Sequence, residues 1–160
     1  MKDIVIRKLS ERGVELMAIA AIVSELQKPY NPDLTPEVCL STVQAVLDKR
    51  EVQHTILVGI ALDTLAEQGH LQEPLCSIVG EDEPLFGVDE ILALGITNVY
   101  GTIGLTNFGY LDKVKPGILR ELNNHPTMVH TFLDDLVAGV AAAASARIAH
   151  NIFRKSSPQR

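Results

Sequence analysis

The stretch HTFLDDLVAGVAAAASARIAH, residues 130–150, places two adjacent aspartates at the head of a run of valine, alanine, glycine and serine. No lysine or arginine occurs between His130 and Arg147, and small residues of this kind suit close packing between helices. We expect a helix built for burial, from about Thr131 to Phe153. Thr131 as the N-cap, with Asp134 three residues later, would form a capping box. That interpretation accounts for Asp134 and leaves Asp135 unexplained.

Helical periodicity extends over most of the remaining chain. Apolar residues recur at spacings of three and four within residues 13–27, 34–50 and 51–69. Thr35 precedes a proline and is a candidate N-cap. Gly69 is a candidate helix end. These signals predict successive amphipathic helices.

The predicted fold class is all-α, a compact single-domain bundle of roughly five to seven helices. Only residues 3–7, DIVIR, carry an alternation that a strand could share. The domain is expected to cover residues 1–155, with a frayed polar tail at 156–160. No repeat, linker or low-complexity segment occurs.

Composition narrows the class of partner. The chain of 160 residues has a formal net charge of −6, so it offers no overall basic footprint for nucleic acid. An acidic protein that handles an anionic substrate needs a metal or a local cation at its site. The two cysteines, Cys39 and Cys76, lack metal-ligand spacing and favour a reduced, cytoplasmic protein.

Membrane insertion is not predicted. The charged segment MKDIVIRKLSERG does not resemble a signal peptide, and no window of eighteen residues is free of charged and strongly polar residues. Mean hydropathy is nevertheless slightly positive, at +0.15. We therefore keep peripheral contact with the inner face of the cell membrane as an option.

Two further acidic clusters lie against apolar sequence. DEPLFGVDE carries Asp82, Asp89 and Glu90, and LDKVKP carries Asp112 and Lys115. On a continuous helix the two aspartates of the first cluster would share a face, although a proline between them interrupts the pattern. In the second cluster the lysine precedes a proline, which disfavours the right-handed helical conformation at the lysine.

Each cluster also has a purely structural interpretation. Asp82 could cap a helix, with Asp89 and Glu90 in a solvated first turn favoured by the helix dipole. Asp112 could be a cap with Lys115 as its surface partner, a pair that contributes little to stability. The sequence by itself leaves these alternatives open.

The functional interpretation brings the three acidic clusters together around one divalent cation. Buried carboxylates are costly unless they are paired or bind metal. Mg²⁺ prefers carboxylate and water ligands and commonly bridges to a substrate phosphate, which a lysine can contact as a point charge. Carboxylates, Mg²⁺ and lysine together favour phosphoryl transfer or hydrolysis of a phosphate ester.

Other candidate residues carry less information. His54 lies on an apolar helical pattern and is interpreted as a structural histidine. Asp63 and Glu67 are four residues apart and could join an acidic site, but we interpret them as a solvent-facing stripe. The glycine pair in GTIG, residues 101–104, lacks the lysine that ends a phosphate-binding loop.

At the three acidic clusters the sequence resembles the phosphatidylglycerophosphatase A family. The matching stretches are DEPLFGVDE, LDKVKP and LDDLVAGV, in the family's order. Residues 49–69 and 100–117 are similar to the small YutG-like branch of Gram-positive bacteria. The chain lacks the long apolar helices of the enterobacterial members and their N-terminal Pro-Gly-Thr-x-Gly segment.

The resemblance implies an all-α, Mg²⁺-dependent phosphatase that converts phosphatidylglycerophosphate to phosphatidylglycerol; Mn²⁺ is a candidate substitute. The resemblance carries over seven residues. Four form the expected metal shell: Asp89, Glu90, Asp134 and Asp135. Three have expected catalytic roles: Asp82 or Asp112 orients water or metal, and Lys115 contacts phosphate.

Two alternatives to the lipid phosphatase remain. One is a phosphatase acting on a soluble phosphomonoester. The other is a helical regulatory or scaffolding module that keeps the fold without catalysis, with the small-residue faces of the last helix used for packing or self-association. Those faces also lead us to expect a homo-oligomer.

Overall fold

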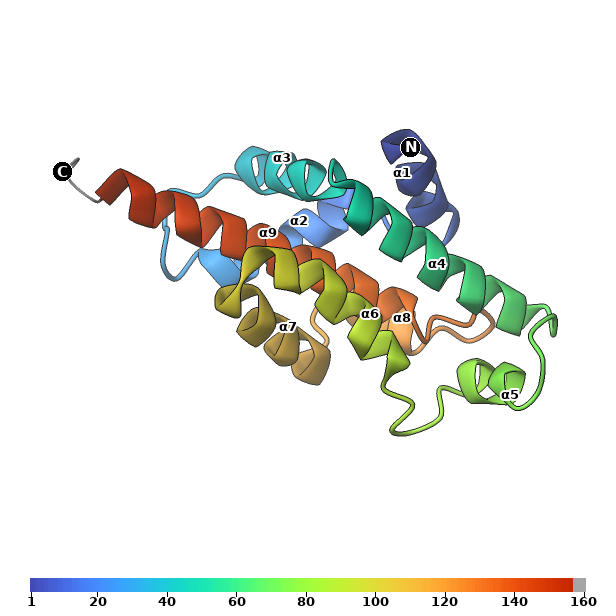
Figure 1. The fold of residues 1–160 in the computed structure, drawn as a ribbon. Coiled ribbons are helices and arrows are strands. Elements are labelled where there is room, and N and C mark those ends of the chain that lie inside the picture. Colours follow the sequence, from blue (N-terminus) through green and yellow to red (C-terminus); the bar gives the residue numbers. More distant parts are fainter. Residues whose placement is uncertain (157–160) are drawn as a thin grey trace.

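The computed structural model describes residues 1–156, which form helices joined by short loops (Figure 1). No strand occurs in this part of the chain. The described residues contain a short 3₁₀ segment, Asn98–Tyr100 (η1), and nine α-helices: Lys2–Glu11 (α1), Leu16–Gln27 (α2), Pro36–Leu47 (α3), Arg50–Glu67 (α4), Leu75–Gly80 (α5), Val88–Thr97 (α6), Thr102–Val114 (α7), Ile118–Asn123 (α8) and Leu133–Ser156 (α9).

The all-α prediction is confirmed, with two differences in detail. Residues 3–7 lie within α1 rather than in a strand, and the buried residues of this helix, Val5 and Leu9, have the four-residue spacing of one helix face. The short helices α5 and α8, of six residues each, raise the number of helices above the predicted range. Apart from Ser156, which ends α9, the predicted polar tail lies outside the described residues.

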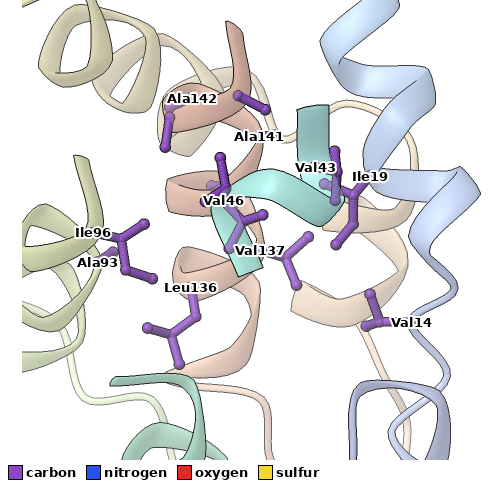
Figure 2. Packing of buried hydrophobic residues seen from close by; sticks show 14 of the residues in the cluster. Val14, Ile19, Val43, Val46, Ala93, Ile96, Leu136, Val137, Ala141 and Ala142 are labelled. Atoms are coloured by element: carbon purple, nitrogen blue, oxygen red, sulfur yellow. The ribbon is translucent and has the colours of Figure 1, made fainter. Parts of the chain in front are cut away.

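Helix α9 is the centre of the bundle. Every residue from 130 to 146 is buried, and α2, α3, α4, α6, α7 and α8 all contact this helix. Figure 1 shows α9 running through the molecule between these neighbours. Figure 2 shows Leu136, Val137 and Ala141 of α9 among side chains from the surrounding helices, such as Val46 and Ile96. The small residues of α9 thus pack within this chain, and the expected homo-oligomer cannot rest on them.

Gly139 sets how closely α9 approaches α6. A Cβ atom at this position would lie 3.1 Å from the carbonyl oxygen of Ala93 and 3.5 Å from its Cα. The two helices run side by side in the same direction (Figure 1). Asp89 precedes Ala93 by one turn and Asp135 precedes Gly139 by one turn. The close contact between the two helices therefore lies one helical turn after the two carboxylates.

Two of the predicted helix-end signals, at Thr35 and at Gly69, are confirmed. Thr35 accepts a hydrogen bond from the backbone N–H of Val38 at 3.4 Å, and Pro36 opens α3. Helix α4 ends at Glu67, followed by Gly69 with φ 68°. Among the described residues, no helix combines the length and apolar character that a membrane span requires.

Candidate functional site

Three carboxylates meet where the first turns of α6 and α9 lie side by side. One oxygen from each of Asp89, Glu90 and Asp135 lies within 4.8 Å of the other two. Asp89 is 7% exposed and Asp135 is 3% exposed. The buried atoms Oδ1 of Asp89 and Oε2 of Glu90 have no hydrogen-bond partner among the described residues. Buried carboxylate oxygens normally have a partner, so these two oxygens are available as ligands for a bound cation.

Three ionised carboxylates in this cluster would repel one another, and burial would make each charge more costly. Burial, reinforced by the adjacent Glu90 carboxylate, raises the pKa of Asp89 to about 7. Burial and the neighbouring Asp134 charge raise the pKa of Asp135 to about 8. A divalent cation would relieve both effects, because it supplies the opposite charge that favours the ionised carboxylates.

The predicted metal ligand Asp134 has a different environment. Its Oδ2 accepts a hydrogen bond from Lys115 Nζ at 2.6 Å, and its Oδ1 accepts one from the backbone N–H of Asp135 at 2.9 Å. Asp134 is therefore placed beside the cluster of Asp89, Glu90 and Asp135, but not in it. Burial raises the pKa of Asp134, and the lysine partly offsets that effect.

Lys115 is the cation that faces the acidic residues. Its Nζ lies 3.4 Å from Oδ1 of Asp112 and 3.7 Å from Oδ1 of Asp135, in addition to the short contact with Asp134. Burial would lower the pKa of Lys115, but the three carboxylates outweigh that effect and raise it. The lysine ends α7 in the left-handed conformation, with φ 45°. This agrees with the effect predicted for the proline that follows it.

All seven residues singled out in the sequence line one cavity of about 230 Å³. Asp82 reaches it from the turn that follows α5, where its φ is 51°. Because residues 81–87 are not helical, Asp82 and Asp89 do not share a helix face, and Asp82 does not cap α6. The seven residues in the wall are Asp82, Asp89, Glu90, Asp112, Lys115, Asp134 and Asp135. We refer to this space as the acidic cavity.

The start of α9 is fixed by Asp63, a residue that the sequence prediction assigned to a solvent-facing stripe. Asp63 is fully buried in α4, and its two oxygens accept the backbone N–H groups of Phe132 and Leu133, both at 3.0 Å. Burial raises the pKa of Asp63 to about 7. The predicted capping box is wrong, because the Thr131 hydroxyl instead donates to the carbonyl of Val79 at 2.6 Å.

Glu67, the second member of the supposed stripe, also holds the segment before α9. Its Oε2 accepts hydrogen bonds from the Arg12 guanidinium and from the backbone N–H of Val129, each at 3.0 Å. The apolar residues on both sides of Asp63 in the sequence were the available sign of its burial. His54, in contrast, is exposed and takes no part in the site.

The residues present fit a hard divalent cation. The donor set consists of carboxylate oxygens, two of which are buried without a partner, and Mg²⁺ and Mn²⁺ both prefer such ligands. Asp89, Glu90 and Asp135 would hold the ion. The ammonium group of Lys115, which contacts Asp134 and Asp135, would be available to an anion that binds the same metal ion.

Known proteins are similar to this chain over most of its length. The family model for phosphatidylglycerophosphatase A matches residues 9–150. The uncharacterized Bacillus subtilis (strain 168) protein YpjQ is 58% identical over 94% of this chain and 85% of its own. For YutG of the same organism the identity is 57%, over 89% and 87% of the two chains.

A solved structure extends the likeness to three dimensions. The crystal structure of Bacillus subtilis YpjQ superposes with a TM-score of 0.93, covering 97% of this chain and 96% of that one, at 55% identity. The family match covers all three acidic clusters. The chain therefore belongs to the phosphatidylglycerophosphatase A family.

Proposed function

We propose that this protein is a Mg²⁺-dependent phosphatase that removes the terminal phosphate of phosphatidylglycerophosphate. The observation that carries the proposal is the acidic cavity, in which three clustered carboxylates lie close to a lysine that contacts their neighbours. Seven acidic residues line this cavity and need positive charge, and the lysine beside them provides a contact for phosphate. Membership of the family supports the reaction class and a phosphorylated lipid as substrate.

The division of roles follows from which carboxylates cluster together. Asp89, Glu90 and Asp135 hold the ion, which when bound neutralises charge on the phosphoryl oxygens. Lys115 contacts a phosphate oxygen, and Asp134 holds the lysine in place through their 2.6 Å contact. Asp82 and Asp112 line the cavity outside the cluster and orient the attacking water. Water adds to phosphorus, the ester P–O bond breaks, and a proton is transferred to the departing alcohol.

Apolar residues around the acidic cavity favour a lipid substrate over a soluble one. Leu85 lines the cavity and is fully exposed, with φ 67°. Val88, Ile91, Tyr110 and Val114 are also exposed, and each lies within two residues of a cavity acid or of Lys115. Exposed apolar residues gathered beside a polar site are one way in which a protein contacts a lipid surface.

The proposal is tested by measuring phosphate release from phosphatidylglycerophosphate in mixed micelles. We expect activity with Mg²⁺, no activity with EDTA, and a loss of at least about 100-fold in Asp135→Asn, because one metal ligand is removed. Asp33→Asn changes an exposed aspartate outside the cavity and serves as the matched control. Full activity in EDTA or in Asp135→Asn would contradict the proposal.

A second variant tests the lipid surface. Ile91→Ser alters an exposed residue of α6 that does not line the acidic cavity. We expect it to lower activity on phosphatidylglycerophosphate in micelles several-fold more than activity on a water-soluble phosphomonoester such as glycerol 3-phosphate. Equal effects on the two substrates would favour a soluble substrate instead.

A further inference from the structure

A second cavity, of about 270 Å³, adjoins the acidic cavity. Its remaining wall comes largely from residues 125–130, which lie in the segment that connects α8 to α9. The two cavities share four lining residues: Asp82, Asn123, Thr131 and Asp134. A molecule whose phosphate occupies the acidic cavity can therefore extend its next atoms into the second cavity.

His130, in the wall of the second cavity, has a buried ring nitrogen without a partner. The side chain is 5% exposed. Its Nδ1 lies 3.1 Å from the carbonyl oxygen of Leu122, and because a carbonyl only accepts, Nδ1 carries the proton. Burial lowers the pKa of His130, so the ring is neutral at physiological pH and Nε2 is a hydrogen-bond acceptor. That Nε2 has no partner among the described residues, and a buried acceptor normally has one.

His125 provides the complementary group in the same cavity wall. Its Nδ1 accepts hydrogen bonds from the backbone N–H groups of Thr127, at 3.3 Å, and Met128, at 2.9 Å. Because Nδ1 is an acceptor, the ring proton lies on Nε2, which can donate. The ring centroids of His125 and His130 are 5.1 Å apart. The cavity thus presents one acceptor and one donor from adjacent rings.

This pair discriminates between classes of chemical group. A hydroxyl group both donates and accepts, so it can pair with His130 and with His125. An ionised phosphate oxygen only accepts and leaves His130 without a partner, and an acyl chain leaves both rings without one. The volume is also below the range typical of apolar pockets for larger ligands.

We propose that the second cavity binds the hydroxyl-bearing alcohol portion of the phosphomonoester, a short polyol such as glycerol, through His130 and His125. This inference rests on the proposed function, since it assigns the phosphate of the same molecule to the acidic cavity. The chemistry is shared by the glycerol phosphate headgroup of a lipid and by free glycerol 3-phosphate.

Two substrate pairs test the proposal and separate these sources. The free pair is glycerol 3-phosphate and n-propyl phosphate. The lipid pair is phosphatidylglycerophosphate and its analogue without the central headgroup hydroxyl, in mixed micelles. We expect kcat/KM to favour the hydroxylated member at least about tenfold, because a site that binds a hydroxyl rejects an analogue without it. If the preference occurs in the lipid pair alone, the ligand is the lipid headgroup. If it occurs in the free pair alone, the ligand is the free polyol phosphate.

Variants locate the preference. The ratio of kcat/KM for the hydroxylated substrate to kcat/KM for its analogue should fall toward one in His130→Phe. In His125→Phe we expect the same ratio to fall several-fold. His54→Phe, which alters an exposed histidine distant in the sequence, should keep the wild-type ratio. No preference in either pair, or a ratio unchanged in both cavity variants, would overturn the proposal. His125 is exposed, so its variant remains informative if His130→Phe fails to fold.

A binding measurement keeps this inference separate from catalysis. In protein labelled with ¹⁵N at histidine, with Mg²⁺ present, we expect glycerol 3-phosphate to shift the Nε2 resonance of His130, while n-propyl phosphate leaves it in place. If phosphatidylglycerophosphate is not hydrolysed but this selective shift occurs, the proposed catalytic function fails and the polyol site stands. If phosphatidylglycerophosphate and its analogue without the hydroxyl are hydrolysed equally and neither free ester shifts the resonance, the polyol site fails and the phosphatase stands.

Discussion

Lys115 Nζ lies 2.6 Å from Oδ2 of Asp134, a residue from the first turn of the central helix. The lysine ends α7, and the aspartate begins α9, so this contact joins two of the sequence motifs. The third motif reaches the same cavity through Asp89 and Glu90 of α6. Among the described residues of the cavity wall, Lys115 is the one lysine or arginine, and it is held by acids beside the proposed metal position.

Replacing Lys115 with methionine should change metal binding and activity in opposite directions. Removing a positive charge near the cluster should tighten Mg²⁺ binding by about tenfold. The same change should lower kcat/KM for phosphatidylglycerophosphate by about 100-fold, because a contact to the developing charge on phosphate is lost. Isothermal titration and the phosphate-release assay measure the two effects. Lys113→Met, at an exposed position of α7, is the control, and a parallel fall in affinity and activity would argue against a phosphate contact.

Tight metal binding should require the close packing of α6 against α9. Gly139→Val places a side chain where a Cβ already lies 3.1 Å from the Ala93 carbonyl oxygen. We expect a loss of about 1–3 kcal/mol in the free energy of unfolding and at least about tenfold weaker Mg²⁺ binding. Gly95→Ala, in α6 with no atom within 4 Å of the added Cβ, should be neutral or stabilising by about 0.5–1 kcal/mol. Unchanged Mg²⁺ affinity in folded Gly139→Val would show that this spacing does not shape the site.

Asp63 should matter for the site although it lies outside the acidic cavity. Asp63→Ala leaves the backbone N–H groups of Phe132 and Leu133 buried without partners, at a cost of about 1–3 kcal/mol. Because these groups precede Asp134 and Asp135 directly, Mg²⁺ affinity should fall as well. Thermal unfolding and metal titration provide the test, with Asp48→Asn, an exposed helix-end aspartate, as the control. A variant that loses stability but binds Mg²⁺ normally would restrict Asp63 to a structural role.

The metal-free protein should lose stability as pH rises from about 6.5 to 8.5. The pKa values of Asp89 and Asp135, about 7 and 8, are raised above their usual value of 3.8. A carboxyl with a raised pKa in the folded state contributes stability that is fully present below its unfolded-state pKa, declines as pH rises above that value, and is lost once pH passes the folded-state pKa. Below this window the lowered pKa of His130 acts in the opposite sense.

Thermal unfolding in EDTA across this window measures the effect. We expect Tm to fall by at least about 2–4 °C, Asp135→Asn to reduce the slope, and Mg²⁺ to restore Tm most strongly at the alkaline end. A metal-free Tm that is constant or rises between pH 6.5 and 8.5 would mean that the clustered carboxylates are not destabilising.

The sequence was most informative where local patterns decide structure. Helical periodicity, the Thr35 cap and the small residues of α9 depend on neighbours in the chain, and the helices formed as expected. The three acidic motifs were also identified, because carboxylates beside apolar residues require an explanation. The seven residues line one cavity, although whether each performs its assigned role stays a prediction.

What the sequence missed depends on distant contacts. Asp63 caps α9 across 69 and 70 residues of chain, and spacing within α4 contains no sign of that partner. The lysine contact of Asp134 spans 19 residues and depends on the bend that ends α7. The paired environments of His125 and His130 arise from backbone groups in a loop, where periodicity gives no guidance.

The central claim is that Asp89, Glu90 and Asp135 bind a catalytic divalent cation. Anomalous scattering from crystals soaked in Mn²⁺ tests it most directly, since it locates the ion and its ligands together. We predict an anomalous peak within about 2.0–2.3 Å of a carboxylate oxygen from each of the three residues, and its absence in Asp135→Asn crystals. A fully soaked wild-type crystal with no peak between α6 and α9, or with its peak at other residues, would contradict the claim.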